Sequence, residues 1–351
     1  MNISFRHVDE LPRPLPSNLA LIDSKAVLES IAAPLASENS DEEKLLKDII
    51  RGLAPSGGRS STSELCLPGR AEQPWRRVNL CALPTECSRH NSPAQPHAIA
   101  DCARSLSGTG DVTIIMCLAD PTHAFAAGCA VARAFPVYSC VSRKRPAGTS
   151  SKASPVSREI TVYLRVPKKN WSTVHGDIVA AAEGIVLAAR LVDTPPNFLH
   201  TSAFVQEAMQ VAIDLKGFGV TTKVIRGQEL SDQGFGGIYG VGKAAVEPPA
   251  LVVLSHPGQP LKTATNGTDG TLEPSLTGSV CFVGKGIVYD SGGLSIKGKT
   301  AMPGMKRDMG GAAAVLAAFQ AAVKAGREWQ GGPRASLPRG EFGGRHGDPS
   351  G

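Results

Sequence analysis

Aromatic residues are scarce in this sequence, and long apolar runs are missing. Phe, Trp and Tyr make up 5% of the 351 residues, and no uninterrupted apolar stretch approaches the roughly 18 residues typical of a membrane-spanning helix. The first residues lack the apolar core and cleavage site of a signal peptide. Aromatics interleaved with basic residues are also absent, so the net charge of +6 does not favour nucleic-acid binding. We therefore expect a cytoplasmic protein that binds neither membranes nor nucleic acids.

Paired cysteine and histidine spacings are missing as well. The eight cysteines include no Cys-x-x-Cys pair, and the eight histidines include no His-x3-His pair. These absences argue against a zinc knuckle and a thioredoxin-type motif. Cys117 and Cys281 lie within apolar runs, where a thiol most simply acts as a small buried hydrophobe. We expect reduced thiols, as is usual in the cytosol.

Strand-like and helix-like segments alternate through the first half of the chain. This alternation predicts an α/β domain with a parallel or mixed sheet. We place it at residues 1–166, with a basic Ser/Pro/Ala linker at about 142–158. A Gly/Ser-rich loop is expected from Pro55 to about Glu72. The expected strands are Leu19–Ile22, Val78–Leu83, Val112–Leu118, Val137–Val141 and Glu159–Val166, and the expected helices are Asp41–Leu53 and Thr122–Phe135.

A second domain is expected at residues 167–326. Helical spacing of apolar residues and strand-like apolar runs again alternate there. The polar stretch Pro257–Thr277 is expected to be a loop, and the Gly/Pro-rich residues 327–351 are expected to be disordered. The expected helices are Thr173–Val192, Ser202–Leu215, Gln228–Asp232 and Ala312–Lys324 with Gly326 as its C-cap, and the expected strands are Val220–Ile225, Ala250–Ser255 and a buried Ser279–Val283.

Residues that can perform chemistry concentrate in residues 283–311. Lys285, Asp290, Lys297 and Asp308 lie there among glycines, which let a backbone approach a ligand closely. A hydrolase that works through metal ions needs carboxylates to hold the ions and cations to stabilise a developing oxyanion. This stretch offers both, although a single charged residue is more often simply solvated.

The run VGKGIVYDSGGLSIKGKTAMPGMKRDMGGAAAV resembles the metal-binding core of the leucyl aminopeptidase family, most of all its aminopeptidase-like animal branch. The resemblance extends upstream through ARLVDTPPNFL and GFGGIYGVGKAAVEPPALVVLSH. It implies a metallo-aminopeptidase that releases unblocked N-terminal amino acids from peptides. It also implies a small N-terminal α/β domain, an α/β catalytic domain with a mixed, largely parallel sheet, and a homo-oligomer, a hexamer in the family.

The resemblance also implies roles for single residues. Lys285 matches the lysine ligand of one metal ion, Asp290 the carboxylate that bridges two ions, and Asp308 a further ligand. Lys297 matches the catalytic lysine that polarises the peptide carbonyl. Met305 matches a residue that lines the pocket for the first side chain of the substrate. Two divalent cations are implied, and oxygen-rich ligands favour Mn, Zn or Mg.

The sequence departs from the family after Gly326. In the family, a later Asn-Thr-Asp-Ala-Glu-Gly-Arg segment gives an Asp and a Glu to the metals and an Arg that holds a bicarbonate base. Residues 327–351 contain no such segment, and the near-copy at residues 266–273 lacks the arginine. We therefore expect an incomplete catalytic domain, weak metal binding and negligible turnover from residues 1–351. The alternative is a non-catalytic fragment that associates with full-length subunits.

Two other motifs are weaker. Residues 237–244 nearly spell a P-loop, but Ala244 stands where the motif needs a hydroxyl residue. A Gly-rich turn beneath the site is the favoured interpretation. Ser291 or Ser295 could belong to a Ser-His-Asp triad, but the sequence has no Gly-x-Ser-x-Gly elbow.

Overall fold

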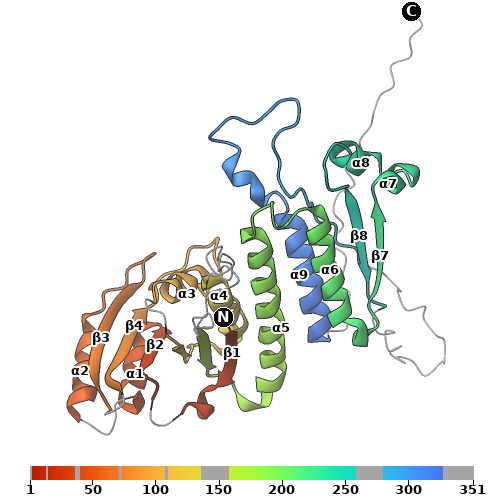
Figure 1. The fold of residues 1–351 in the computed structure, drawn as a ribbon. Coiled ribbons are helices and arrows are strands. Elements are labelled where there is room, and N and C mark those ends of the chain that lie inside the picture. The colour runs from red at the N-terminus through yellow and green to blue at the C-terminus, as the bar shows by residue number, and fades with distance from the viewer. Residues whose placement is uncertain are drawn as a thin grey trace, which may run out of the picture. The chain divides into compact units, whose positions relative to one another are not determined.

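The computed structural model describes residues 2–12, 15–35, 40–70, 73–106, 110–135, 158–257 and 280–326. These residues form a six-stranded sheet with flanking helices, followed by a helical part with a two-stranded sheet (Figure 1). The strand expected at 137–141, nearly all of the two expected loops at 142–158 and 257–277, and the stretch 327–351 lie outside the described residues.

The first sheet has the strand order β1-β6-β5-β2-β4-β3. β3 pairs antiparallel with β4, and all other neighbours run parallel. This sheet confirms the α/β domain with a parallel or mixed sheet that the alternating pattern predicts. Its strands are β1 (Asn2–His7), β2 (Asn18–Asp23), β3 (Ser61–Arg70), β4 (Gln73–Ala82), β5 (Val112–Met116) and β6 (Glu159–Leu164).

β3 shows that the loop expected from Pro55 to about Glu72 was wrong over residues 61–70, whereas residues 55–60 form neither helix nor strand, as expected. The strand pairs with β4 along its whole length, from Ser61 opposite Ala82 to Arg70 opposite Gln73. Leu67 of β3 is buried in the core. Gly and Ser lower the intrinsic strand propensity, but the pairing with β4 and the burial of Leu67 override it.

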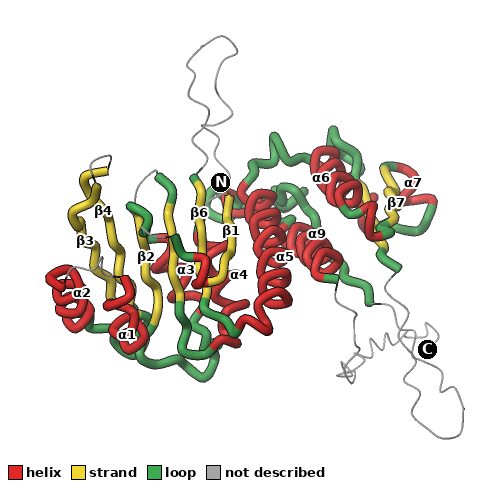
Figure 2. The backbone as a smooth tube through the Cα atoms, turned by 90° about the horizontal axis from the view of Figure 1, so that it is seen from below, coloured by secondary structure: helices red, strands yellow, loops and turns green. Residues whose placement is uncertain are grey.

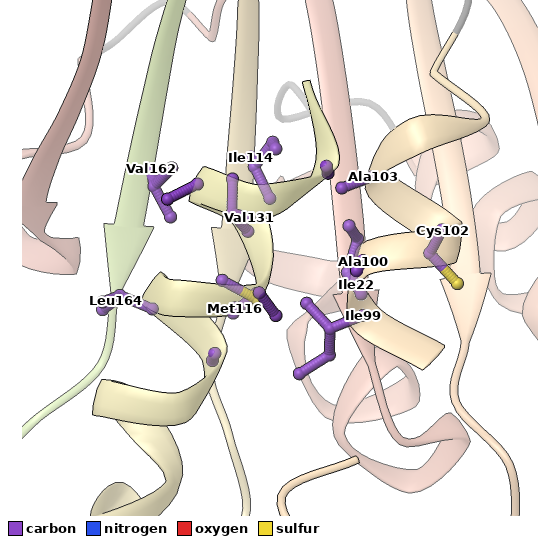
Figure 3. Close-up of a cluster of buried hydrophobic side chains, with 14 of the residues drawn as sticks. Ile22, Ile99, Ala100, Cys102, Ala103, Ile114, Met116, Val131, Val162 and Leu164 are labelled. Atoms are coloured by element: carbon purple, nitrogen blue, oxygen red, sulfur yellow. The ribbon is translucent and has the colours of Figure 1, made fainter. Parts of the chain in front are cut away.

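Helices cover both faces of the first sheet. α1 (Lys25–Leu35) and α2 (Ser40–Gly52) pack on one face, and α3 (Pro96–Arg104) and α4 (Ala124–Ala134) pack on the other, with two short 3-10 turns at η1 (Val8–Glu10) and η2 (Pro121–His123). Leu19 and Leu21 of β2 join the α1/α2 core, whereas Ile22 joins the α3/α4 core shown in Figure 3. A strand that is buried on both faces has apolar residues at successive positions, because each face must be apolar.

Asp23 ends β2 as a buried carboxylate. Its Oδ2 accepts hydrogen bonds from the backbone N–H groups of Cys117 and Leu118, both at 2.8 Å. Its Oδ1 accepts a third from the N–H of Ser24 at 2.8 Å. Burial raises the pKa of this carboxyl above its usual value, and the three N–H donors oppose that rise. Asp23 thereby joins the ends of β2 and β5.

Replacing Asp23 with Asn should lower the free energy of unfolding by about 1–3 kcal/mol. The amide nitrogen of Asn is a donor, and it would face one of the N–H groups that the carboxylate now accepts. Urea denaturation followed by circular dichroism measures the loss. Asp101→Asn, at an exposed position of α3, is the matched control and should change little. Equal stability of both variants would contradict this account of the carboxylate.

The second part of the structure begins with the 26-residue helix α5 (Lys168–Asp193). α5 contacts β1 and α4 on one side and α9 on the other (Figure 2). None of the described helices combines the length and apolarity that crossing a membrane requires. The remaining elements are α6 (Thr201–Asp214), η4 (Lys216–Phe218), β7 (Thr221–Arg226), α7 (Gln228–Asp232), α8 (Gly236–Gly242), β8 (Ala250–Ser255), η5 (Pro303–Arg307) and α9 (Gly310–Ala325).

Two expectations for this second part were wrong. Residues 280–283 form no strand, and Phe282 and Val283 are 67% and 89% exposed. Cys281 is therefore exposed, whereas Cys117 is buried as expected. A strand needs a hydrogen-bonded neighbour, and β8 pairs with β7 alone among the described strands. The expected Gly-rich turn at residues 237–244 is the helix α8 for most of its length.

Candidate metal centre

The four charged residues of the stretch 283–311 form two ion pairs. Nζ of Lys285 lies 3.1 Å from Oδ2 of Asp308, and Nζ of Lys297 lies 3.1 Å from Oδ2 of Asp290. The side chain of Asp308 is the least exposed of the four, at 23%, and that of Lys285 the most exposed, at 58%. Among the residues that the structure describes, each carboxylate thus pairs with a different ammonium.

A tight loop brings Lys297 back to Asp290. Oδ1 of Asp290 accepts a hydrogen bond from the N–H of Gly292 at 2.9 Å, and the N–H of Lys297 donates to the carbonyl of Ser291 at 2.9 Å. Gly292 has φ +94°, and a Cβ there would lie 2.3 Å from the carbonyl oxygen of Ser295. The loop therefore requires glycine at this position.

The pKa of Asp290 lies below its usual value. The largest cause is the hydrogen bond from the N–H of Gly292, followed by the hydrogen bond and charge of Lys297. The charge of Lys285 lowers the pKa further. Because Lys285 acts on Asp290 while pairing with Asp308, the two ion pairs are electrostatic neighbours. Asp290 is therefore available as an ionised ligand throughout the neutral range.

Close packing on the first turn of α9 places Lys285 beside Asp308. The N–H of Ala312 donates to the carbonyl of Lys285 at 2.8 Å. A Cβ on Gly284 would lie 2.6 Å from both Ala312 Cα and the Gly311 carbonyl oxygen. The backbone before Lys285 therefore lies directly against the helix. Asp308 immediately follows η5, and its N–H donates to the carbonyl of Met305 at 3.2 Å.

One buried atom at this site fits a metal ligand. Oδ2 of Asp308 is buried and accepts no hydrogen bond of good geometry from the residues that the structure describes, and its ionic partner is the Lys285 ammonium at 3.1 Å. The ammonium compensates the charge of this oxygen, and its lone pairs could serve a metal ion if Lys285 were displaced or deprotonated. Within the described ranges, no three His, Cys, Asp or Glu side chains gather closely enough to hold a metal. The residues thus fit part of a ligand set: two carboxylates and one lysine nitrogen.

Met305 and Lys306 also belong to the stretch 283–311, and both lie in η5. Met305 lies half-buried in η5, where its N–H donates to the carbonyl of Met302 at 2.9 Å. Lys306 was missed by sequence reasoning: its Nζ donates to the carbonyl of Asp193, at the end of α5, at 2.9 Å. A lysine at a helix C-terminus is favourable, but a partner 113 residues away gives no local signal. Lys306 therefore ties η5 to α5.

Comparisons with known proteins identify the family. Residues 39–144 match the M17 aminopeptidase N-terminal domain 2. Residues 186–330 match the catalytic domain of the cytosol aminopeptidase family, M17, and include both ion pairs. The chain belongs to the M17 leucyl aminopeptidase family. These matches confirm the family expected from the glycine-rich stretch.

Individual M17 relatives agree with these matches. The mouse protein named Probable aminopeptidase NPEPL1 is 45% identical over 253 residues, which cover 71% of this chain and 44% of that protein. Leucine aminopeptidase 1 of Caenorhabditis elegans is 33% identical over 88% of this chain and 56% of its own length. The apo structure of leucyl aminopeptidase from Trypanosoma cruzi superposes with a TM-score of 0.71 at 30% identity, covering 93% of this chain and 60% of that one. This M17 chain therefore spans about half the length of the curated relatives it matches.

Proposed function

We propose that this chain contributes to a metal-dependent aminopeptidase that releases unblocked N-terminal amino acids from peptides. The observation that supports the proposal is the pair of adjacent Lys–Asp ion pairs in a matched M17 catalytic domain. Lys285, Asp290 and Asp308 would hold two divalent cations, with Asp290 shared between them, and Met305 would line the pocket for the first side chain of the substrate. We further propose a cytoplasmic homo-oligomer, hexameric as in the family.

Lys297 would act on the substrate through its charge. Divalent cations, when bound, supply the Lewis acidity that activates water and polarises a carbonyl. The ammonium of Lys297 would stabilise negative charge on the carbonyl oxygen of the scissile peptide bond. Its present partner is Asp290, at 3.1 Å. An Asp290 carboxylate engaged with cations would leave this ammonium available to the substrate.

Residues 1–351 by themselves should bind metal weakly. A divalent cation of this kind prefers about six ligands, and two carboxylates with one lysine nitrogen cannot supply that number for two ions. Lys285 must also lose its proton before it can serve as a ligand. We therefore propose negligible turnover of leucine amide by this chain alone.

The metal role of Asp290 can be tested by titrating manganese into the full chain. Asp290→Ala should weaken manganese binding about 10- to 100-fold, measured by isothermal titration calorimetry, because it removes the carboxylate proposed to bridge both ions. Asp232→Ala, at an exposed position on α7, is the matched control and should bind as the parent does. Unchanged binding by Asp290→Ala would refute the ligand role. Rapid hydrolysis of leucine amide by the parent chain would instead contradict the proposed weak metal binding and negligible turnover.

A further inference from the structure

η5 determines where two side chains of the candidate site lie. It contains Met305 and is followed directly by Asp308. None of its five residues is buried, so the removal of apolar surface from water contributes little to holding this turn in place. Its internal hydrogen bonds have the poorer geometry that is usual in 3-10 turns. Polar contacts with other elements are therefore needed to fix the orientation of η5.

Lys306 makes such a contact. Its Nζ donates to the carbonyl of Asp193 at 2.9 Å, and Asp193 is the last residue of α5. Among the residues that the structure describes, no other hydrogen bond joins η5 to a segment beyond residues 302–308. Loss of the Lys306 ammonium would therefore leave η5 without a hydrogen bond to the helix beside it.

The end of α5 lacks a cation of its own for its last carbonyl group. Arg190 is the basic residue of the last turn, but its guanidinium donates two hydrogen bonds to the Glu207 carboxylate of α6, at 2.7 and 2.6 Å. Thr194 serves the Arg190 carbonyl with both its N–H and its hydroxyl. The Asp193 carbonyl accepts from Lys306 alone among the described residues. A positive charge at this position also suits the negative end of the helix dipole.

We propose that Lys306 is a positioning residue of the candidate site. Its bond to α5 fixes η5, and thereby holds Asp308 beside Lys285 and Met305 at the substrate pocket. The N–H of Asp308 donates to the carbonyl of Met305, so a shift of η5 moves both residues. Lys306 itself touches neither metal nor substrate. This inference rests on the proposed function, which assigns Asp308 to the metals and Met305 to the pocket.

The charge of Lys306 and its positioning role predict opposite changes in metal affinity. A positive charge near divalent cations repels them, so the loss of that charge alone would tighten metal binding. The loss of position would weaken it. Arg307 provides the control for charge, because it is the next residue and is exposed. Its guanidinium donates no hydrogen bond to the described residues, so Arg307→Met removes the charge and leaves the contact with α5 in place.

The test uses the full chain and two measurements. Lys306→Met removes the ammonium but keeps most of the alkyl chain, and it should weaken manganese binding about tenfold in isothermal titration calorimetry, as is usual for residues that orient metal ligands. Amide hydrogen exchange of residues 303–308 should become faster, while exchange in α9 stays as in the parent. Lys306→Arg keeps a donor and a charge and should recover most of the affinity. Arg307→Met should bind manganese as tightly as the parent or slightly more tightly.

Thr194→Val separates positioning from ordinary stabilisation of α5. It removes the hydroxyl that donates to the Arg190 carbonyl at 2.6 Å, so it should lower the urea midpoint and leave manganese affinity unchanged. An affinity loss equal to that of Lys306→Met would overturn the proposal. Parent-like affinity or parent-like exchange of residues 303–308 in Lys306→Met would overturn it as well. A parent chain that binds no manganese would contradict the proposed function instead, and the exchange of residues 303–308 would still decide whether Lys306 holds η5.

Discussion

Replacing the lysine equivalent to Lys297 with Ala in an active full-length M17 relative should lower kcat about 100- to 1000-fold. The expected loss reflects the removal of a positive charge that stabilises the developing oxyanion. Metal content should stay near normal, because Lys297 is proposed to act through charge and not as a ligand. Hydrolysis of leucine amide gives kcat, and plasma mass spectrometry of the purified protein gives the metal content.

Lys299 provides the control for this substitution. It lies two residues further along and is exposed, so Lys299→Ala should keep kcat close to that of the parent. Lys297→Arg keeps the charge and should recover part of the lost kcat, although the guanidinium is larger. Loss of metal from Lys297→Ala would mean that this lysine holds the site together, and the catalytic role would then be wrong.

Replacing Gly284 with Val should destabilise the second part of the chain by about 3 kcal/mol. An added Cβ would lie 2.6 Å from both Ala312 Cα and the Gly311 carbonyl oxygen, and neither backbone atom can move cheaply. Residues 282–286 would separate from α9, and Lys285 would move away from Asp308. Manganese affinity should fall together with the stability.

Urea denaturation and manganese titration together measure this effect. Gly298→Val is the matched control, because a Cβ at Gly298 would meet nothing within 4 Å. The control should keep both the stability and the affinity of the parent. A Gly284→Val chain that unfolds at the same urea concentration as the parent would show that the contact with α9 contributes little.

Elements whose signals are local could be predicted from the sequence. The helix at Ala312–Lys324 was expected from its apolar composition, and α9 spans Gly310–Ala325. Gly326 ends it with φ +62°, as expected for a C-cap. α7 and β8 were predicted at their observed bounds. In each case, the sequence signal lies within the element or immediately after it, although β8 also needs β7 as its hydrogen-bonded neighbour.

Elements that depend on distant partners could not be predicted in this way. β3 exists because β4 pairs with it, and residues 280–283 remain without a strand although their composition favours one. The charged residues of the candidate site were recognised from their spacing and family resemblance. Their pairing depends on the fit of Gly284 against α9 and on the loop at Gly292, which are tertiary features. The metal and catalytic roles of these residues stay predictions.

α5 packs closely against the helix on each of its two sides. On one side, a Cβ at Gly128 of α4 would lie 2.6 Å from Cγ2 of Ile178, and on the other, a Cβ at Gly184 would lie 2.9 Å from the carbonyl oxygen of Ala317. Each of the two contacts therefore depends on a glycine, Gly128 in α4 for the first and Gly184 in α5 itself for the second. A chimera that exchanged only the first domain would therefore need a glycine at the position equivalent to Gly128 to keep this contact with α5.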